Sequence, residues 1–140
     1  MPLKFHPEPG TILICDFVGM KEPEMVKTRP VVVVSPRLKH RNGLLTIVPL
    51  STTPPPHICN YHCEITINPA LPEPFDHVKV WVKCDMIYNV GFWRLELVRT
   101  SRDRTGKRKY IQQLIDREDL KKIRAAMLHG LALGELTKHM

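Results

Sequence analysis

The chain has 140 residues, of which 43% are hydrophobic and 25% charged, a composition that excludes the disordered, collagen-like and coiled-coil classes. Its 21 Lys and Arg against 14 Asp and Glu give a net charge of +7, and such an excess favours a polyanionic partner, with nucleic acid first. A chain of this length can bury enough surface to form its own core, so we expect one domain over residues 1–140.

No feature of the sequence predicts a membrane or secreted protein. The longest apolar runs, such as residues 30–34 and 44–50, are far shorter than the roughly 18 residues that a membrane-spanning helix needs. Residues 1–7 lack the apolar core and the small-residue cleavage site of a secretory signal. We therefore expect a cytoplasmic protein with four free thiols, of which Cys15 and Cys84 are buried as small apolar side chains.

The distribution of proline predicts short strands in most of the chain and a helix near its end. All 13 prolines lie before residue 75, and proline interrupts both helices and the hydrogen-bond ladders of sheets. Residues 19–27, polar and without periodicity, are expected to form a functional loop. Apolar and β-branched runs predict strands at residues 11–18, 28–35, 43–50, 61–68, 78–90 (one long strand or a bent pair) and 109–115.

The C-terminal part of the sequence predicts one helix over residues 117–133. Asp116 is expected to cap its N-terminus, and the acids that follow suit the positive end of the helix dipole. Gly134 suits its end. Apolar residues with helical spacing predict its buried face: Leu120, Ile123, Met127 and Leu131. The expected fold is mainly β with α, a small open barrel of antiparallel strands with a C-terminal helix.

Residues 57–63 hold four potential metal ligands within seven positions. Their spacing matches neither a C-x-x-C pair nor a zinc finger, and the alternation of a strand would place His62 and Cys63 on opposite faces. We therefore expect no metal and no cofactor. The segment is instead predicted to be a loop beside the functional cleft, with Cys63 pointing inward.

A run of six cations within residues 99–109 predicts a basic arm that follows a phosphate backbone. The nearby aromatic side chains of Phe92, Trp93 and Tyr110 suit stacking on bases, provided that Trp93 and Trp81 are not buried. The alternative is a solvated hairpin loop without a ligand.

Four segments stand in an order and at a spacing that point to a known family. They read PGTI at 9–12 with DF at 16–17, KTRPVVVVS at 27–35, TIVPLST at 46–52, and VKCDMI at 82–87 followed by RL at 94–95. Together they resemble the MazF/PemK (Kid, CcdB-like) family of toxin ribonucleases. The similarity covers most of residues 8–133, including the final strand and helix. The segments LSTTPP at 50–55 and RTGKRK at 104–109 look most like a branch called YifN-like.

The resemblance implies an SH3-like barrel that forms a homodimer, cleaves single-stranded RNA without a metal and is neutralised by a cognate antitoxin protein. It also implies two catalytic residues, an arginine that falls on Arg29 and a threonine whose place is taken here by Ser51. Thr52 substitutes for Ser51 if the loop is shifted by one residue. The residues expected to bind substrate are Asp16, Lys27, His57, Asp85, Arg94, Arg104 and Lys107.

RNA cleavage requires specific chemical groups, which limits the roles that these residues can have. Attack by the RNA 2′-OH needs a general base, a general acid and cations on the phosphate oxygens. Arg29 suits the cationic role, because its guanidinium offers a fixed fork of donors. Alternatively, Arg29 forms a structural ion pair, and Ser51 and Thr52 are ordinary turn hydroxyls. The candidates for the general base and the general acid are Asp16, Asp85, His57 and His62, and the sequence does not choose among them.

Three functions are compatible with the sequence. The first is a metal-independent endoribonuclease toxin of a type II toxin–antitoxin system, with the loop of residues 19–27 gating the cleft and docking the antitoxin. The second is an SH3-like barrel that binds nucleic acid without catalysis. The third is a CcdB-like toxin that binds a topoisomerase subunit. An Arg29 that faces the cleft beside a free hydroxyl favours the first, whereas an Arg29 locked in a buried ion pair favours the others.

Overall fold

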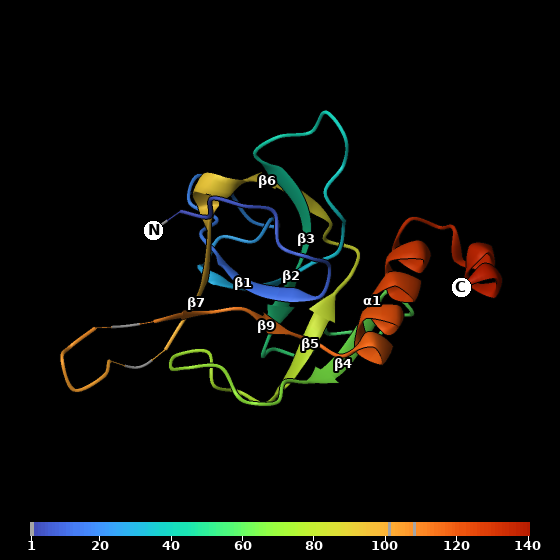
Figure 1. Cartoon of the computed structure of the whole chain (residues 1–140). Helices are drawn as coiled ribbons and strands as arrows, with labels where there is room; N and C mark the ends of the chain where they lie inside the picture. The colour runs from blue at the N-terminus through green and yellow to red at the C-terminus, as the bar shows by residue number, and fades with distance from the viewer. Residues whose placement is uncertain (1, 101, 108) are drawn as a thin grey trace.

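The computed structural model describes residues 2–100, 102–107 and 109–140, in which a curved antiparallel sheet carries a helix at one end (Figure 1). The strands are β1 (Thr11–Cys15), β2 (Arg29–Val33), β3 (Leu44–Ser51), β4 (His62–Thr66), β5 (Lys79–Lys83), β6 (Tyr88–Gly91), β7 (Leu95–Arg99), β8 (Tyr110–Ile111) and β9 (Gln113–Leu114). They pair in the order β4-β5-β3-β2-β1-β7-β8, while β6 also pairs with β3 and β9 with β1. Within these ranges β4 and β8 do not pair, so the predicted barrel is open.

Strand β3 connects the two parts of the sheet. Its first half pairs with β6, its middle with β2, and its last two residues, Leu50 and Ser51, with β5. The strand is eight residues long, and because the sheet twists, its pairing partner changes along its length. As a result, the turn after Ser51 lies where β2 begins.

Two apolar clusters lie on opposite faces of the central strands. Ile12 and Val32 belong to the larger cluster, and Leu13 and Val31 to the smaller one, because successive side chains of a strand point to opposite faces. All five residues of β1 are buried. A strand covered on both faces has no polar alternation, which explains the continuous apolar runs in this part of the sequence.

The predicted environment of the cysteines is confirmed. Cys15 and Cys84 are buried, and burial raises the pKa of the Cys15 thiol to about 12. Cys63 packs inward against the larger cluster, as predicted. A hydrogen bond between the Cys63 and Cys84 thiols lowers the pKa of Cys63 and raises that of Cys84. All four cysteines carry free thiols.

Helix α1 (Arg117–Gly130) packs beside β4 and covers one end of the larger cluster (Figure 1). Ile123 and Ala126 are buried in that cluster, and Met127 packs against it. The predicted N-cap is confirmed, because Asp116 Oδ1 accepts a hydrogen bond from the backbone N–H of Asp119 at 2.8 Å. None of the helices in the described ranges has the length and apolar character needed to cross a membrane.

Removal of this cap should weaken the fold by a measurable amount. We expect Asp116→Ala to lower the free energy of unfolding by about 1 kcal/mol, because the N–H of Asp119 loses its acceptor. Glu118→Ala is the control, since it removes an acid from the same first turn but no cap. Urea denaturation followed by circular dichroism measures both variants. An equal loss for the two would assign the effect to charge rather than to capping.

Several predicted strand boundaries are corrected by the pairing of distant segments. Residues 95–99, for which the sequence predicts no strand, form β7, because they pair with the buried strand β1. Residues 109–115 form two short strands, β8 on β7 and β9 on β1, rather than one. For residues 78–90 the second of the two predicted alternatives is confirmed, because two strands, β5 and β6, are separated by a turn at residues 84–87.

The end of the helix is also corrected. The helix stops at Gly130 instead of residue 133, and Ala132 adopts a left-handed conformation with φ of 59°. Gly134 does not end α1 but begins a separate 3-10 helix, η2 (Gly134–His139). Leu131, predicted on the buried face, is 56% exposed because it lies beyond the last helical turn.

Candidate active site

The start of β2 and the end of β3 bring Arg29 and Ser51 together. The two strands are antiparallel, and Val31 lies opposite Pro49. Continuing that register by two residues places Arg29 opposite Ser51, on the face of the sheet that also carries Val31. Ser51 pairs on its other side with Trp81 of β5, which holds its backbone in place.

Arg29 is half-buried, and part of its guanidinium has no partner. Its Nε atom is buried and makes no hydrogen bond within the described part of the chain. Nor does Arg29 form an ion pair there with Asp16 or Asp85. Burial lowers the pKa of Arg29 from its ordinary value, and the nearby Tyr88 partly opposes this shift. A buried donor without an acceptor costs roughly 1–3 kcal/mol, and a bound anion removes that cost.

Arg29 and Ser51 line two adjoining cavities. The first cavity, of about 230 Å³, is also lined by Lys27, Thr28, Thr52, Thr53 and His77. The second, of about 400 Å³, is also lined by Lys27, Thr53, Lys83 and the preceding loop, residues 22–26. We call the two together the Arg29 cleft. Its shared wall carries two cations, which suits a phosphate group.

The two candidate hydroxyls of the Arg29 cleft differ in exposure. Ser51 is only 8% exposed, and its Oγ accepts a hydrogen bond from the backbone N–H of Thr53 at 3.1 Å. Its own proton is directed to the Thr53 carbonyl oxygen at 3.5 Å, a distance at which a hydrogen bond is weak. Ser51 is therefore a turn hydroxyl that retains a proton to donate. Thr52 is exposed beside it.

The loop of residues 19–27 borders the Arg29 cleft, and the core holds it at Met25, two residues before Lys27. The backbone N–H of Met25 donates a hydrogen bond to Tyr88 Oη at 3.0 Å. The ring of Tyr88 packs against Phe17, with the ring centroids 5.3 Å apart. Met25 itself is buried in the smaller cluster. These contacts fix the backbone two residues before Lys27, which lines both cavities of the cleft.

Asp16 and Arg94, two of the predicted substrate-binding residues, line a different cavity of about 360 Å³. Arg94 Nη1 donates hydrogen bonds to the carbonyl oxygens of Asp16 and Val18, at 3.0 and 2.7 Å. Its guanidinium also lies 4.3 Å above the ring of Trp93. Trp93 is 62% exposed, so the condition for base stacking holds at this residue. Thr28 lines this cavity as well as the first cavity of the cleft.

His57 and Asp85 do not line the Arg29 cleft. Asp85 Oδ1 lies 3.9 Å from His62 Nε2, and His62 Nδ1 accepts a hydrogen bond from the backbone N–H of Cys59 at 3.1 Å. These contacts organise the segment of residues 57–63. Among the residues that the structure describes, no three or more His, Cys, Asp or Glu side chains are grouped so that they could hold a metal ion.

Arg104 and Lys107 lie on the arm between β7 and β8, which extends away from the sheet (Figure 1). Residues 102–107 turn around Asp103, whose Oδ1 accepts hydrogen bonds from backbone N–H groups of the turn at 2.8 and 3.0 Å. Arg104 and Lys107 are exposed and line neither cavity of the cleft. Arg108, part of the predicted basic run, lies outside the described residues.

The structure adds three polar residues to the cleft that sequence reasoning missed. Thr28 and His77 line the first cavity, and Lys83 lines the second. His77 supplies an imidazole, the side chain best suited to proton transfer near neutral pH. It follows β4 in an irregular segment, and no motif around it marks a function. Only its place in the wall of the cavity that Ser51 also lines makes it a candidate.

A curved, open antiparallel sheet with a terminal helix and a cationic cleft at the ends of two central strands defines a class of small, mainly β proteins. The family model described as PemK-like, MazF-like toxin of type II toxin–antitoxin system matches residues 8–131. The chain therefore belongs to the PemK-like, MazF-like toxin family, as the order of its four segments indicated.

Individual relatives agree with this assignment. The uncharacterized protein YifN of Escherichia coli (strain K12) is 29% identical over 150 aligned positions, which cover 94% of this chain and 95% of that protein. An endoribonuclease from a mycobacterial species, solved in complex with its cognate antitoxin, has a TM-score of 0.58 at 19% identity, covering 91% and 97% of the two chains. MazF from Deinococcus radiodurans also has a TM-score of 0.58, at 18% identity and with 92% and 99% covered. The predicted PemK-like fold is confirmed.

Proposed function

We propose that this chain is the toxin of a type II toxin–antitoxin system and cleaves single-stranded RNA without a metal ion. The observation that carries the proposal is the half-buried Arg29, whose Nε lacks a hydrogen-bond partner in the described ranges and which lies opposite Ser51 in a cleft. A phosphodiester supplies the negative charge and the acceptor oxygens that such an arginine lacks. Family membership supports the toxin assignment, and the mycobacterial relative described as an endoribonuclease supports the reaction.

The reaction uses the substrate's own nucleophile. The 2′ oxygen attacks the adjacent phosphorus, a general base takes its proton, and the 5′ oxygen leaves with a proton from a general acid. Arg29 and Lys27 stabilise the charge that grows on the phosphate oxygens, and the Ser51 hydroxyl donates to one of them. His77 takes the proton of the 2′-OH as general base, and the imidazolium so formed gives a proton to the leaving 5′ oxygen as general acid. The products are a 2′,3′-cyclic phosphate and a 5′-hydroxyl.

The other two functions are less well supported. A non-catalytic binder and a topoisomerase-binding toxin would each be favoured by an Arg29 that is held in a structural ion pair. Across the described ranges, Arg29 forms no such pair with Asp16 or Asp85. Its unpaired Nε beside a hydroxyl that can still donate favours catalysis on a phosphate.

The proposal also covers the binding partners of the chain, its oligomeric state and the cellular compartment in which it acts. The chain acts as one domain of residues 1–140 in the cytoplasm, where RNA is the polyanion that its net charge of +7 attracts. A cognate antitoxin blocks it, as suggested by the relative solved with its antitoxin. Two copies form a homodimer, and the reaction needs no cofactor.

The direct test incubates the purified protein with a long single-stranded RNA in EDTA and maps the product ends. Discrete fragments with cyclic-phosphate or 3′-phosphate ends are expected. RNA that stays intact but binds with a steep dependence on salt would replace the proposal with a non-catalytic binder. Absence of both cleavage and binding would leave the topoisomerase-binding toxin.

The two hydroxyls at the end of β3 can be distinguished by their effects on the cleavage rate. We expect Ser51→Ala to slow cleavage at least roughly tenfold, because a hydrogen bond to a charged phosphate is lost. Thr52→Ala, the matched control, should stay within about twofold of wild type. Single-turnover cleavage of labelled RNA measures both, and Ser51→Thr should restore most of the rate. The reverse order of effects would assign the role to Thr52.

A further inference from the structure

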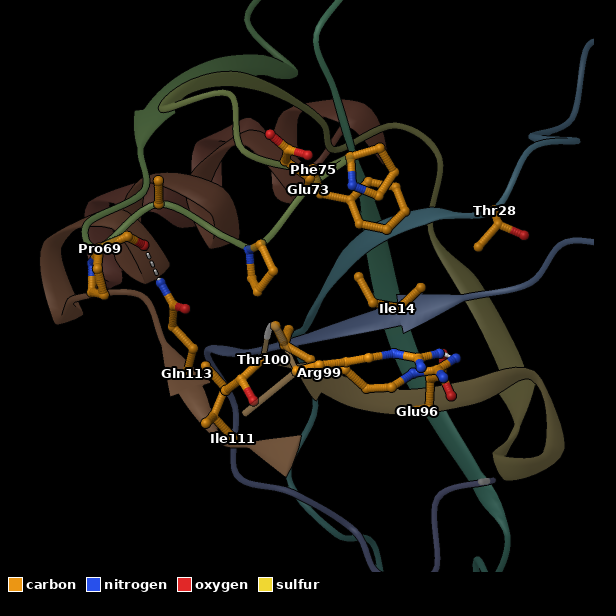
Figure 2. Close-up of a pocket in the computed structure, with 15 residues that line it drawn as sticks. Ile14, Thr28, Pro69, Glu73, Phe75, Glu96, Arg99, Thr100, Ile111 and Gln113 are labelled. Atoms are coloured by element: carbon orange, nitrogen blue, oxygen red, sulfur yellow. Dashed lines mark hydrogen bonds and ion pairs between the residues drawn. The ribbon is translucent and has the colours of Figure 1, made fainter. Parts of the chain in front are cut away.

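A cavity of about 710 Å³ adjoins the Arg29 cleft and is not used by the proposed mechanism (Figure 2). It lies between the base of the arm and the segment of residues 69–75, and its apolar walls include Ile14, Phe75 and Ile111. It shares Thr28, Pro74 and Phe75 with the first cavity of the cleft. An RNA strand with one phosphate at Arg29 therefore has a neighbouring nucleotide within reach of this second space.

The wall of this cavity contains a buried amide oxygen that has no partner. Gln113, on β9, is only 8% exposed, and its Nε2 donates a hydrogen bond to the Pro69 carbonyl oxygen at 2.6 Å. That bond sets the orientation of the amide group. Its Oε1 makes no hydrogen bond in the part of the chain that the structure describes. Figure 2 shows this oxygen on the cavity side of the amide, away from Pro69.

The remaining polar groups divide between the interior and the rim. The exposed Glu73 adds a carboxylate at the wall formed by residues 69–75 (Figure 2). Arg99 and Arg102 stand at the base of the arm, where Arg99 is paired with Glu96 at 2.8 Å. One acceptor, Gln113 Oε1, therefore lies in the apolar wall, and the exposed Arg99 and Arg102 lie at the rim, where a phosphate backbone can pass.

We propose that this cavity holds one unpaired base of the RNA and that Gln113 Oε1 accepts a hydrogen bond from an exocyclic amino group of that base. Adenine and cytosine carry an amino group at the position where uracil carries a carbonyl oxygen. The apolar walls contact the faces of the base, as in other single-strand binding sites. A carbonyl oxygen at that position would place acceptor against acceptor. The cavity thus selects adenine or cytosine over uracil.

This inference rests on the proposed function, since it assigns base selectivity to the same substrate. The test therefore measures binding and cleavage separately. Non-cleavable 2′-fluoro oligonucleotides, uridine-only except for one adenine or cytosine at each position in turn, are bound to wild-type protein and followed by fluorescence anisotropy. We expect one position at which the amino-bearing base binds roughly 3- to 10-fold more tightly than uridine. Replacing that adenine with purine, which lacks the amino group, should abolish the gain.

The variant Gln113→Leu removes the amide at nearly constant size, and the selectivity should fall to within about twofold. Gln112→Leu changes the exposed neighbour on the same segment and should leave the selectivity intact. Since β9 pairs with β1, the unfolding temperature of Gln113→Leu is measured as well. The amino-free purine substrate tests the inference on wild-type protein even if that variant does not fold.

The outcomes separate the two proposals. Cleavage by wild type without any preference for an amino-bearing base overturns the base pocket and leaves the proposed function standing. A preference that depends on Gln113, in a protein that cleaves no RNA, overturns the proposed function and supports the pocket. Absence of any RNA binding overturns both.

Discussion

Arg29→Ala is expected to slow RNA cleavage by about 10²- to 10³-fold, the loss seen when a preorganised donor to a developing charge is removed. The reason is geometric, because Arg29 is held opposite Ser51 at the start of β2 with a buried Nε that has no other acceptor in the described ranges. Arg29→Lys should recover little of the rate, since an ammonium group cannot replace the planar fork. Single-turnover kinetics at saturating protein measure both variants.

Two controls distinguish catalysis from charge and from folding. Arg37→Ala removes an exposed cation from a loop outside the Arg29 cleft and should keep the rate within about twofold at physiological salt. The unfolding temperature of Arg29→Ala should equal or exceed that of wild type, because a desolvated guanidinium with an unpaired Nε is removed. An equal loss of rate in Arg37→Ala, or a marked fall in stability for Arg29→Ala, would show that Arg29 acts through net charge or structure.

Phe17→Ala is expected to lower the free energy of unfolding by about 3–5 kcal/mol, the largest stability effect that we predict. The side chain is fully buried in the smaller cluster and packs against Tyr88, which also accepts the hydrogen bond from the Met25 backbone N–H. Loss of the ring therefore leaves a cavity and loosens the anchor of the loop beside the Arg29 cleft. Urea unfolding monitored by fluorescence measures the change.

The neighbouring position supplies the matched control for Phe17→Ala. Val18 is 58% exposed, and Val18→Ala should change the stability by no more than about 0.5 kcal/mol. If both substitutions cost the same, the smaller cluster does not support the loop as the packing indicates. If Phe17→Ala costs less than about 1 kcal/mol, the ring is not a core element.

Local sequence patterns were sufficient for most of the elements. Short-range rules predict the strand that buries Val31 to Val33, the polar loop of residues 19–27 and the helix that starts after Asp116. Local rules failed where a distant partner decides the structure. Residues 95–99 become a strand because β1 offers them an unpaired edge, and Leu131 is exposed because the backbone turns at Ala132.

The candidate site divides in the same way. Arg29, Ser51 and Lys27 were recognisable in the sequence because they lie in segments that resemble a family, and the structure brings them to one cleft. The register between β2 and β3 places Arg29 opposite Ser51, and this register cannot be predicted from the spacing of the residues along the chain. Nor can the spacing show that His77 lines the same cavity as that pair, or that β9 pairs with β1 and Gln113 binds Pro69. Side chains far apart in sequence meet through long-range packing and hydrogen bonding, so these features were decided only when the sheet formed.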